Sequence, residues 1–278
     1  SIRRLEVRVE RQEIVNNNVF LRCSVCGEVV EREIRVPLLD GSGGYKKTEV
    51  HCVCKCQREK KEAYEKRLRF EEEQRTVNNL RLLSLMDARL KAVRFSNYKI
   101  TEDNRKAFDI AKRYVDHFGE MFSKGQGILF WGSVGTGKSY TAAAIANELL
   151  EQMQSVIMTS FIKLLDEMSC FNRDDSEYIA KLNQAKLLII DDLGAERITD
   201  FALEKVYDII DSRYRSGKPA IFTTNLTMRQ MKECTDIRYN RIYDRIFEMC
   251  YPVKFDGMSW RKKEAAARFS EMKHILEG

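Results

Sequence analysis

The chain has 278 residues, enough for two domains of ordinary size with a hydrophobic core, or equally for one domain with a small appendage. Hydrophobic residues make up 44% of it and charged residues 32%, a globular composition, and three prolines are too few for a Pro-rich linker or a disordered tail. The 48 Lys and Arg residues against 42 Asp and Glu residues give a net charge of +6, which permits nucleic-acid binding without requiring it.

The sequence predicts neither a secretory signal nor a membrane span. Charges stand at nearly every second position of the opening segment SIRRLEVRVE, and no apolar run approaches the ~18 residues that a membrane helix needs. We therefore expect a cytoplasmic protein. Five of the eight cysteines lie within the first 56 residues. In a reducing compartment such a cluster favours metal ligands or redox groups over disulfides.

The first predicted elements are short strands. Residues 28–36 alternate between apolar and polar side chains, residues 40–44 (DGSGG) form a turn, and residues 45–53 are extended again, which predicts a hairpin bracketed by cysteines. From Gln57 to about Val93 the chain is highly charged, lacks Gly and Pro, and spaces its leucines as a helix does. We interpret this stretch as one or two helices with solvated faces that connect two domains.

Beyond the connector, short apolar strands alternate with longer helical stretches. Such alternation predicts an α/β fold with a parallel sheet and crossover helices, whose ligand site lies at the carboxyl ends of the strands. The predicted strands are GILFW at 127–131, SVIMT at 155–159, KLLII at 186–190 and PAIFTT at 219–224. The sequence therefore divides into a cysteine domain at 1–56, a charged helical connector at 57–94 and an α/β domain at 95–278.

The first of these strands leads into a phosphate-binding motif. Gly132 to Ser139 fit G-x-x-x-x-G-K-[ST] at every fixed position, and a strong helix follows. Glycines let backbone N–H groups approach the phosphates of a nucleoside triphosphate, Lys138 reaches the terminal phosphates, and Ser139 ligates Mg²⁺. The predicted nucleotide contacts are Gly132, Ser133, Val134, Gly135, Thr136, Gly137, Lys138, Ser139 and Tyr140.

Two acids follow the strand at 186–190. Asp191 is expected to hold magnesium, directly or through water, and Asp192 to orient or deprotonate an attacking water as a general base. The alternative is that both acids cap the next helix. The last of the four strands is followed by Asn225, whose amide can hydrogen-bond both the attacking water and the γ-phosphate.

Four segments follow the P-loop in a specific order: LLIIDDLG at 187–194, TTN at 223–225, RIYDRI at 241–246 and GMSWR at 257–261. In this order and spacing they resemble the DnaC/DnaI helicase-loader family of AAA+ ATPases, whose core is shared by IstB-type transposition helpers. The resemblance covers about residues 95–270. It implies an ASCE-type P-loop sheet in three layers that binds ATP, with the segment 95–108 closing over the base.

The resemblance also implies roles for three side chains. Asn225 takes the sensor-1 role and Arg261 the sensor-2 role. Arg245 is implied to be an arginine finger that acts on the ATP of a neighbouring subunit, so that hydrolysis requires self-association. The alternative for Arg245 is a surface salt bridge on its helix. The Arg-x-x-x-Arg spacing and the apolar Ile242 and Ile246 favour an interface helix.

In the family that the chain resembles, an extra helix before the acidic strand touches single-stranded DNA. The corresponding segment here is 161–182, where Phe171 lies between an amphipathic stretch and a polar break. Phe171 is expected to stack on a base, while Lys163 or Arg173 contacts phosphate. The alternative is that Phe171 belongs to the core.

The N-terminal cysteines have the spacing of a zinc site. Cys23-x-x-Cys26 brings two sulfurs to one ion, and Gly27 suits the positive φ of the tight turn that follows. In an extended segment the cysteines further along the chain point to one side, so periodicity cannot choose the second pair. The candidates for that pair are His51, Cys52, Cys54 and Cys56.

The resemblance favours one pair among these candidates. N-terminal domains of DnaI-like loaders often bind zinc and end in Cys-x-Cys before a basic helix, which implies Cys54 and Cys56, with Cys52 or His51 in reserve. The alternatives are unliganded thiols and a redox Cys-x-x-Cys, although no thioredoxin-like βαβ pattern surrounds the motif. The zinc would be structural in a zinc-ribbon-like domain, because about 60 residues with few large apolar side chains form little core.

The leading hypothesis is a phage or bacterial ATPase that loads the replicative hexameric DNA helicase onto single-stranded DNA. In this hypothesis the zinc domain binds the helicase, and ATP binding and hydrolysis control assembly and release. One alternative is an IstB-like transposition helper that acts on duplex DNA with a transposase. Another is a nucleotide-gated binding module with little turnover, which the acid pair and the two arginines disfavour.

Overall fold

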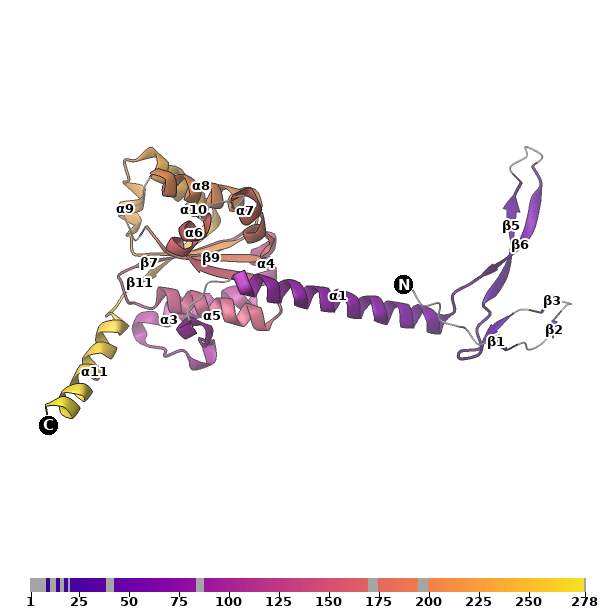
Figure 1. The fold of residues 1–278 in the computed structure, drawn as a ribbon, viewed down its shortest axis with the longest axis horizontal. Coiled ribbons are helices and arrows are strands. Elements are labelled where there is room, and N and C mark those ends of the chain that lie inside the picture. The colour runs from indigo at the N-terminus through magenta and orange to yellow at the C-terminus, as the bar shows by residue number, and fades with distance from the viewer. Residues whose placement is uncertain are drawn as a thin grey trace. The chain divides into compact units, whose positions relative to one another are not determined.

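Figure 1 shows the computed structural model, which describes residues 9–10, 14–15, 18–19, 21–38, 43–83, 88–169, 175–194 and 200–277. Backbone contacts divide the chain into two compact units, Ser1–Glu73 and Gln74–Gly278. The division falls inside the long helix α1 (Lys55–Leu83). None of the helices in the described ranges is both long and apolar enough to cross a membrane.

The first unit consists mainly of paired strands. Its strand pairs are β1 (Val9–Glu10) with β4 (Arg22–Cys23), β2 (Ile14–Val15) with β3 (Asn18–Val19), and β5 (Glu31–Pro37) with β6 (Tyr45–His51), all antiparallel. The β5–β6 pair is the hairpin that the alternating sequence predicts, and most of its side chains are exposed. Among the described residues the buried core of this unit is limited to Cys23, Val30 and Cys54.

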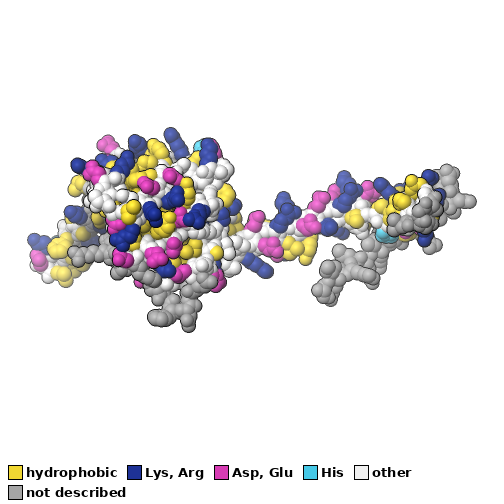
Figure 2. Space-filling model, turned by 90° about the horizontal axis from the view of Figure 1, so that it is seen from above, with side chains coloured by type: hydrophobic (Ala, Val, Ile, Leu, Met, Phe, Trp, Pro, Cys, Tyr) yellow, Lys and Arg dark blue, Asp and Glu magenta, His cyan; other side chains and the backbone are white. Residues whose placement is uncertain are grey.

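Helix α1 begins at Lys55, two residues before the predicted start. Lys and Arg side chains interleave with Glu side chains along it, as Figure 2 shows. Exposed pairs of opposite charge lie four residues apart, which supports a helix that has no apolar stripe of its own. These pairs are Lys55 with Glu59, Lys61 with Glu65, and Arg67 with Glu71.

The second unit is built on a five-stranded parallel sheet with the order β11-β7-β10-β9-β8. The strands are β7 (Gly127–Gly132), β8 (Val156–Ser160), β9 (Leu187–Leu193), β10 (Ala220–Thr224) and β11 (Cys250–Phe255). The four predicted strands are all present, and β11 is an addition. Pro252 and the exposed Lys254 obscure its strand pattern in the sequence, and its place at the edge of the sheet tolerates proline.

Helices cover both faces of this sheet and complete the three-layer arrangement that the resemblance implies (Figure 1). The alternation of β7 shows the division, because Ile128 and Phe130 pack into one layer and Leu129 into the other. One layer contains α3 (Glu102–Asp116), α4 (Phe118–Ser123) and α5 (Lys138–Glu151). The other contains α6 (Phe161–Ser169), α7 (Asp175–Gln184), α8 (Asp200–Arg215), α9 (Met228–Lys232) and α10 (Ile237–Met249).

Two short elements precede α3 and one helix ends the chain. They are α2 (Ala88–Lys91), a 3-10 turn at Phe95–Asn97, and α11 (Trp260–Leu276). Ser259 caps α11 by accepting a hydrogen bond from the backbone N–H of Lys262.

A buried arginine ties α8 to the sheet. The Arg213 side chain is fully buried, and its guanidinium donates to the carbonyl oxygens of Ala185, Lys186 and Pro219. Burial lowers the pKa of Arg213 to about 10. These carbonyls lie just before β9 and β10, so one side chain fixes the entry of both strands that end beside the P-loop.

Candidate nucleotide site and metal centre

The loop between β7 and α5 has the backbone that a phosphate-binding loop requires. Gly132, Gly135 and Gly137 have φ values of +134°, +80° and +104°, a region that side chains rarely adopt. A Cβ atom at Gly132 would also lie 2.2 Å from the carbonyl oxygen of Phe255. The loop therefore needs glycine at these positions, and it leads into the N-terminus of α5, where backbone N–H groups favour anions.

Lys138 is anchored at the centre of this loop. Its Nζ donates to the carbonyl oxygens of Gly132 (2.8 Å) and Ser133 (2.7 Å) and to Oδ1 of Asn225 (2.8 Å). Burial lowers the pKa of the Lys138 ammonium, and the nearby charges of Asp192 and Asp191 oppose this shift. The ammonium thus lies between the P-loop and the amide that follows β10.

The two acids follow each other at the end of β9. Thr223 Oγ1 donates to Asp191 Oδ1 at 2.5 Å, and the backbone N–H of Asp192 donates to Thr223 Oγ1 at 2.9 Å. Burial raises the pKa of Asp191, and hydrogen bonds from Thr223 and Ser139 oppose it. The hydroxyl of Ser139 and the carboxylate of Asp191 are adjacent hard oxygen donors, a set that fits Mg²⁺.

A cavity of about 850 Å³ collects most of the predicted site residues. The predicted residues that line it are Val134, Gly135, Gly137, Lys138, Ser139, Tyr140, Lys163, Asp191, Asp192, Asn225 and Arg261. The remaining predicted residues of the phosphate-binding loop are Gly132, Ser133 and Thr136. The Thr136 hydroxyl donates to the Ser133 carbonyl oxygen within this loop. The backbone N–H of Trp260 donates to the Gly135 carbonyl oxygen at 2.8 Å, which fixes Arg261 beside the P-loop.

The cavity is also lined by residues to which the sequence assigned no individual role. Leu90, Asn97 and Tyr98 line it. The Tyr98 ring meets the Tyr140 ring edge to face at a centroid distance of 5.3 Å, and the Tyr98 hydroxyl lies 2.7 Å from Thr141 Oγ1. These apolar and aromatic groups suit a nucleotide base. The aromatic residues in the segment 95–108 could have indicated part of this lining from the sequence. Nothing in the sequence indicated Leu90, which lies in the predicted connector.

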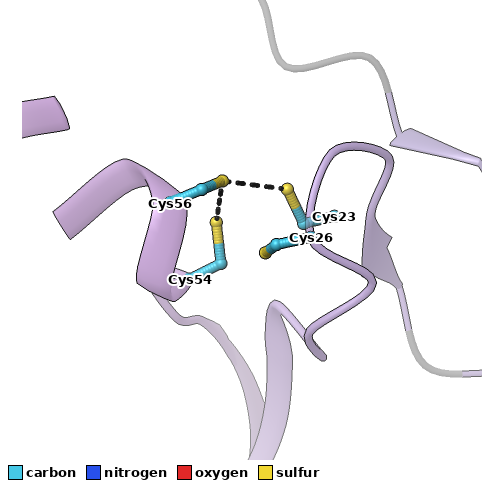
Figure 3. A group of neighbouring side chains, drawn as sticks. All are labelled: Cys23, Cys26, Cys54 and Cys56. Atoms are coloured by element: carbon cyan, nitrogen blue, oxygen red, sulfur yellow. Dashed lines mark hydrogen bonds between the residues drawn. The ribbon is translucent and has the colours of Figure 1, made fainter. Parts of the chain in front are cut away.

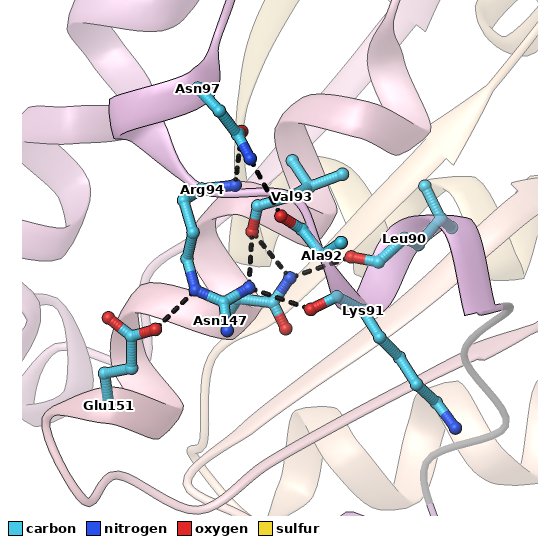
Figure 4. A network of polar contacts seen from close by, with 8 residues as sticks. All are labelled: Leu90, Lys91, Ala92, Val93, Arg94, Asn97, Asn147 and Glu151. Atoms are coloured by element: carbon cyan, nitrogen blue, oxygen red, sulfur yellow. Dashed lines mark hydrogen bonds and ion pairs between the residues drawn. The ribbon is translucent and has the colours of Figure 1, made fainter.

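Polar side chains of α5 hold the segment 90–94, in which Leu90 lines the cavity, as Figure 4 shows. The amide of Asn147, which is 3% exposed, donates to the carbonyl oxygens of Leu90 and Val93 at 2.8 Å each. Arg94 forms an ion pair with Glu151 one turn further along α5. The helix that begins at the P-loop therefore also determines where Leu90 lies.

Arg245 lies outside the cavity lining, on α10. Its Nε is 3.3 Å from Asp211 Oδ1, and its guanidinium lies 4.2 Å from the ring centroid of Tyr214. The side chain remains 33% exposed. This is the salt bridge that the alternative interpretation describes, and a role toward a second subunit stays a prediction.

The predicted DNA contacts are only partly described. Phe171 and Arg173 lie outside the described residues. Lys163 lies on α6 and lines the nucleotide cavity. Its contact with DNA stays a prediction.

Four cysteines of the first unit converge on one point (Figure 3). The ligand atoms of Cys23, Cys26, Cys54 and Cys56 all lie within 4.8 Å of one another. Two of their separations are 3.5 Å, between Cys23 and Cys56, and 3.2 Å, between Cys54 and Cys56. Tetrahedral thiolates at about 2.3 Å from zinc are about 3.8 Å apart, so the group fits this ion.

The reserve ligands point elsewhere. Cys52 Sγ lies 3.9 Å from the Val50 carbonyl oxygen, and His51 Nδ1 lies 3.6 Å from Glu31 Oε1. The pair that the resemblance implies is the one that the structure brings together with the Cys-x-x-Cys.

The Cys-x-x-Cys turn favours a thiolate. Gly27 has a φ of +71°, and its N–H donates to the Cys23 carbonyl oxygen, which closes the predicted turn. Backbone N–H groups of Cys26 and Val25 lower the pKa of Cys23 to about 6. A thiolate is the form that binds a metal. The thiols of Cys54 and Cys23 raise the pKa of Cys56.

Sheet order and site together define the class of this protein. β10 lies between the P-loop strand β7 and the acidic strand β9, and helices cover both faces, which is the arrangement of an AAA+ ATP-binding domain. The chain belongs to the family of IstB-like ATP binding proteins, a sequence model of which matches residues 56–267.

Several curated relatives carry the name of replicative helicase loader, and two of them represent the group. DnaC of Escherichia coli (strain K12) is 30% identical over 157 residues, which cover 55% of this chain and 62% of DnaC. DnaI of Bacillus subtilis (strain 168) is 27% identical over 181 residues, which cover 60% of this chain and 58% of DnaI. A crystal structure of DnaI matches with a TM-score of 0.54 and 28% identity, over 62% of this chain and 96% of that chain. The chain thus spans less than two thirds of the length of either curated relative.

Proposed function

We propose that this protein is an ATPase that loads the replicative hexameric DNA helicase onto single-stranded DNA. The observation that supports this proposal best is that the groups to which we assign ATP binding and hydrolysis within one subunit line one cavity, in a chain whose relatives include proteins named replicative helicase loader. These groups are Lys138, Ser139, Asp191, Asp192, Asn225 and Arg261.

In the proposed reaction, ATP lies along the P-loop with its base between Leu90 and Tyr140. Lys138 exchanges its hydrogen bond with Asn225 for oxygens of the terminal phosphates. Ser139 and Asp191 would hold Mg²⁺, which would neutralise charge on the transferring phosphoryl group.

The remaining groups act on the attacking water and the developing charge. Asp192 accepts the proton of the water, and the amide of Asn225, once released by Lys138, orients that water against the γ-phosphate. Arg261 stabilises phosphate charge from within the same subunit. Arg245 does so from a neighbouring subunit, for which it must leave the buried carboxylate of Asp211.

The cysteine group gives the first unit a separate role. Cys23, Cys26, Cys54 and Cys56 would hold a structural zinc ion, which would fix the hairpin next to the start of α1. We assign this unit to helicase docking and the ATPase unit to single-stranded DNA. ATP binding sets the contacts between subunits, and hydrolysis releases helicase or DNA.

A loading assay with the full chain tests this function. A hexameric replicative helicase and single-stranded DNA are supplied, and helicase retained on DNA is measured with and without ATP. Asp192→Asn should bind ATP and helicase but fail to release, because its amide cannot take the proton of the attacking water. Cys23→Ser should lose helicase binding while it retains ATP binding, and Cys52→Ser, outside the metal group, should behave as wild type.

Two outcomes would contradict the proposal. Retention of helicase by Cys23→Ser would refute the docking role of the zinc unit. Binding of duplex DNA without any effect on helicase would instead favour the transposition-helper hypothesis.

A further inference from the structure

A threonine at the end of β10 contacts both acids of the site. Thr223 is fully buried. Its Oγ1 donates to the Asp191 carboxylate and accepts from the backbone N–H of Asp192. A single hydroxyl therefore fixes the side chain of one acid and the backbone of the next.

This contact lies where the pairing of β9 with β10 changes register. Phe222 pairs with Ile190, but Thr224 pairs with Leu193, so β9 contains one extra residue. Asp192 lies in this bulge with a φ of +57°, which is uncommon for a residue other than glycine. Bulges redirect side chains, and Asp192 lines the nucleotide cavity. Such a backbone persists only where neighbouring contacts fix it.

We propose that Thr223 is a positioning residue for ATP hydrolysis. Its hydroxyl orients the Asp191 carboxylate beside Ser139 for Mg²⁺, and it stabilises the bulge that turns Asp192 into the cavity. This inference rests on the proposed ATPase function. A hydroxyl is required because one atom must both donate to a carboxylate and accept from an N–H group, which serine can do and valine cannot.

The neighbouring threonine offers a matched control. Thr224 is also fully buried, but its hydroxyl donates to the Leu193 carbonyl oxygen and accepts from the Leu226 N–H. Its partners are backbone groups alone. Thr223→Val and Thr224→Val therefore remove the same chemical group from adjacent buried positions, and only the first removes a contact with an acid.

The test measures ATP binding by the full chain in EDTA and over a Mg²⁺ titration, together with steady-state hydrolysis. Thr223→Val should bind ATP in EDTA as wild type does. It should require about 10- to 100-fold more Mg²⁺ for the metal-dependent gain in affinity. Its kcat should fall more than its KM rises. Thr223→Ser should restore both properties, and Thr224→Val should lower thermal stability while its Mg²⁺ midpoint stays at the wild-type value.

The outcomes separate this inference from the proposed function. A wild-type Mg²⁺ midpoint in Thr223→Val, or a Thr223→Ser variant as defective as Thr223→Val, would overturn the positioning role. If the wild-type chain hydrolysed no ATP, the proposed function would fail, while the Mg²⁺ titration would still decide the role of Thr223. Should Thr223→Val not fold, Thr223→Ala is titrated in its place, with the same expected Mg²⁺ requirement.

Discussion

The two units of this chain are stabilised in different ways. In the second, both faces of the sheet bury large apolar side chains, so hydrophobic burial is the main source of its stability. In the first, the core of the described residues is Cys23, Val30 and Cys54, and the hairpin exposes Ile34 and Tyr45. So small a core needs a cross-link, which four convergent cysteines can supply through a metal. The comparison teaches that bonds from side chains to a metal can take the place of a hydrophobic core in one part of a chain.

The strongest test of this difference removes one of the four proposed zinc ligands. Cys23→Ser should abolish zinc binding and unfold the first unit, because structural zinc sites contribute about 10 to 16 kcal/mol to folding. Metal analysis and hydrogen exchange over the hairpin measure the loss, and ATP binding by the second unit should persist. Cys52→Ser is the control. A protected hairpin in zinc-free Cys23→Ser would show that packing suffices in this unit.

The converse test weakens packing in the second unit. Phe222 is fully buried in the central strand β10, and Phe222→Ala should destabilise this unit by about 3 to 5 kcal/mol. Chemical denaturation measures the change, and zinc content should remain one ion per chain. The exposed Tyr45→Ala in the first unit should change stability by no more than about 0.5 kcal/mol. Loss of zinc from Phe222→Ala would contradict independent stabilisation.

The two units also differ in how well the sequence predicts their structure. Continuous apolar runs such as KLLII predict central strands well, because a strand buried on both faces has no polar alternation. β11 escapes prediction because an edge strand alternates and admits Pro252. The P-loop is predictable because the loop between β7 and α5 requires glycine and a basic residue at fixed spacing.

Other features depend on tertiary contacts that no local pattern reports. The choice of Cys54 and Cys56 could not follow from strand periodicity, because α1 begins at Lys55 and Cys56 lies in its first turn. The Thr223 contact depends on a register shift between strands far apart in the sequence. The contribution of Leu90 to the base end of the cavity depends on Asn147, which lies more than fifty residues later.

A test with a smaller expected effect concerns the hydrogen bond between Asn147 and Leu90. Asn147→Ala removes two buried hydrogen bonds, to the carbonyl oxygens of Leu90 and Val93, and at about 0.5 to 1.5 kcal/mol for each bond this should cost about 1 to 3 kcal/mol of stability in the second unit. Because Leu90 lines the cavity, ATP affinity should also fall, by about tenfold for each 1.4 kcal/mol transferred to binding. Denaturation and ATP titration measure both. Glu151→Ala removes only the partly exposed ion pair with Arg94 and should change stability and ATP affinity less. An equal change would mean that this ion pair, and not Asn147, holds Leu90 in place.

The smallest expected effect lies in α1, which neither a core nor the metal group covers along most of its length. Lys61 and Glu65 are separated by 3.9 Å and their side chains are 74% and 49% exposed, so Glu65→Gln should cost no more than about 0.5 kcal/mol. Thermal unfolding at low and high salt measures it, and the difference should vanish at high salt because exposed charges are screened. A loss above about 1 kcal/mol that persists in high salt would mean that α1 packs against another surface in solution. The helix would then be a third stabilised region rather than a solvated connection between two.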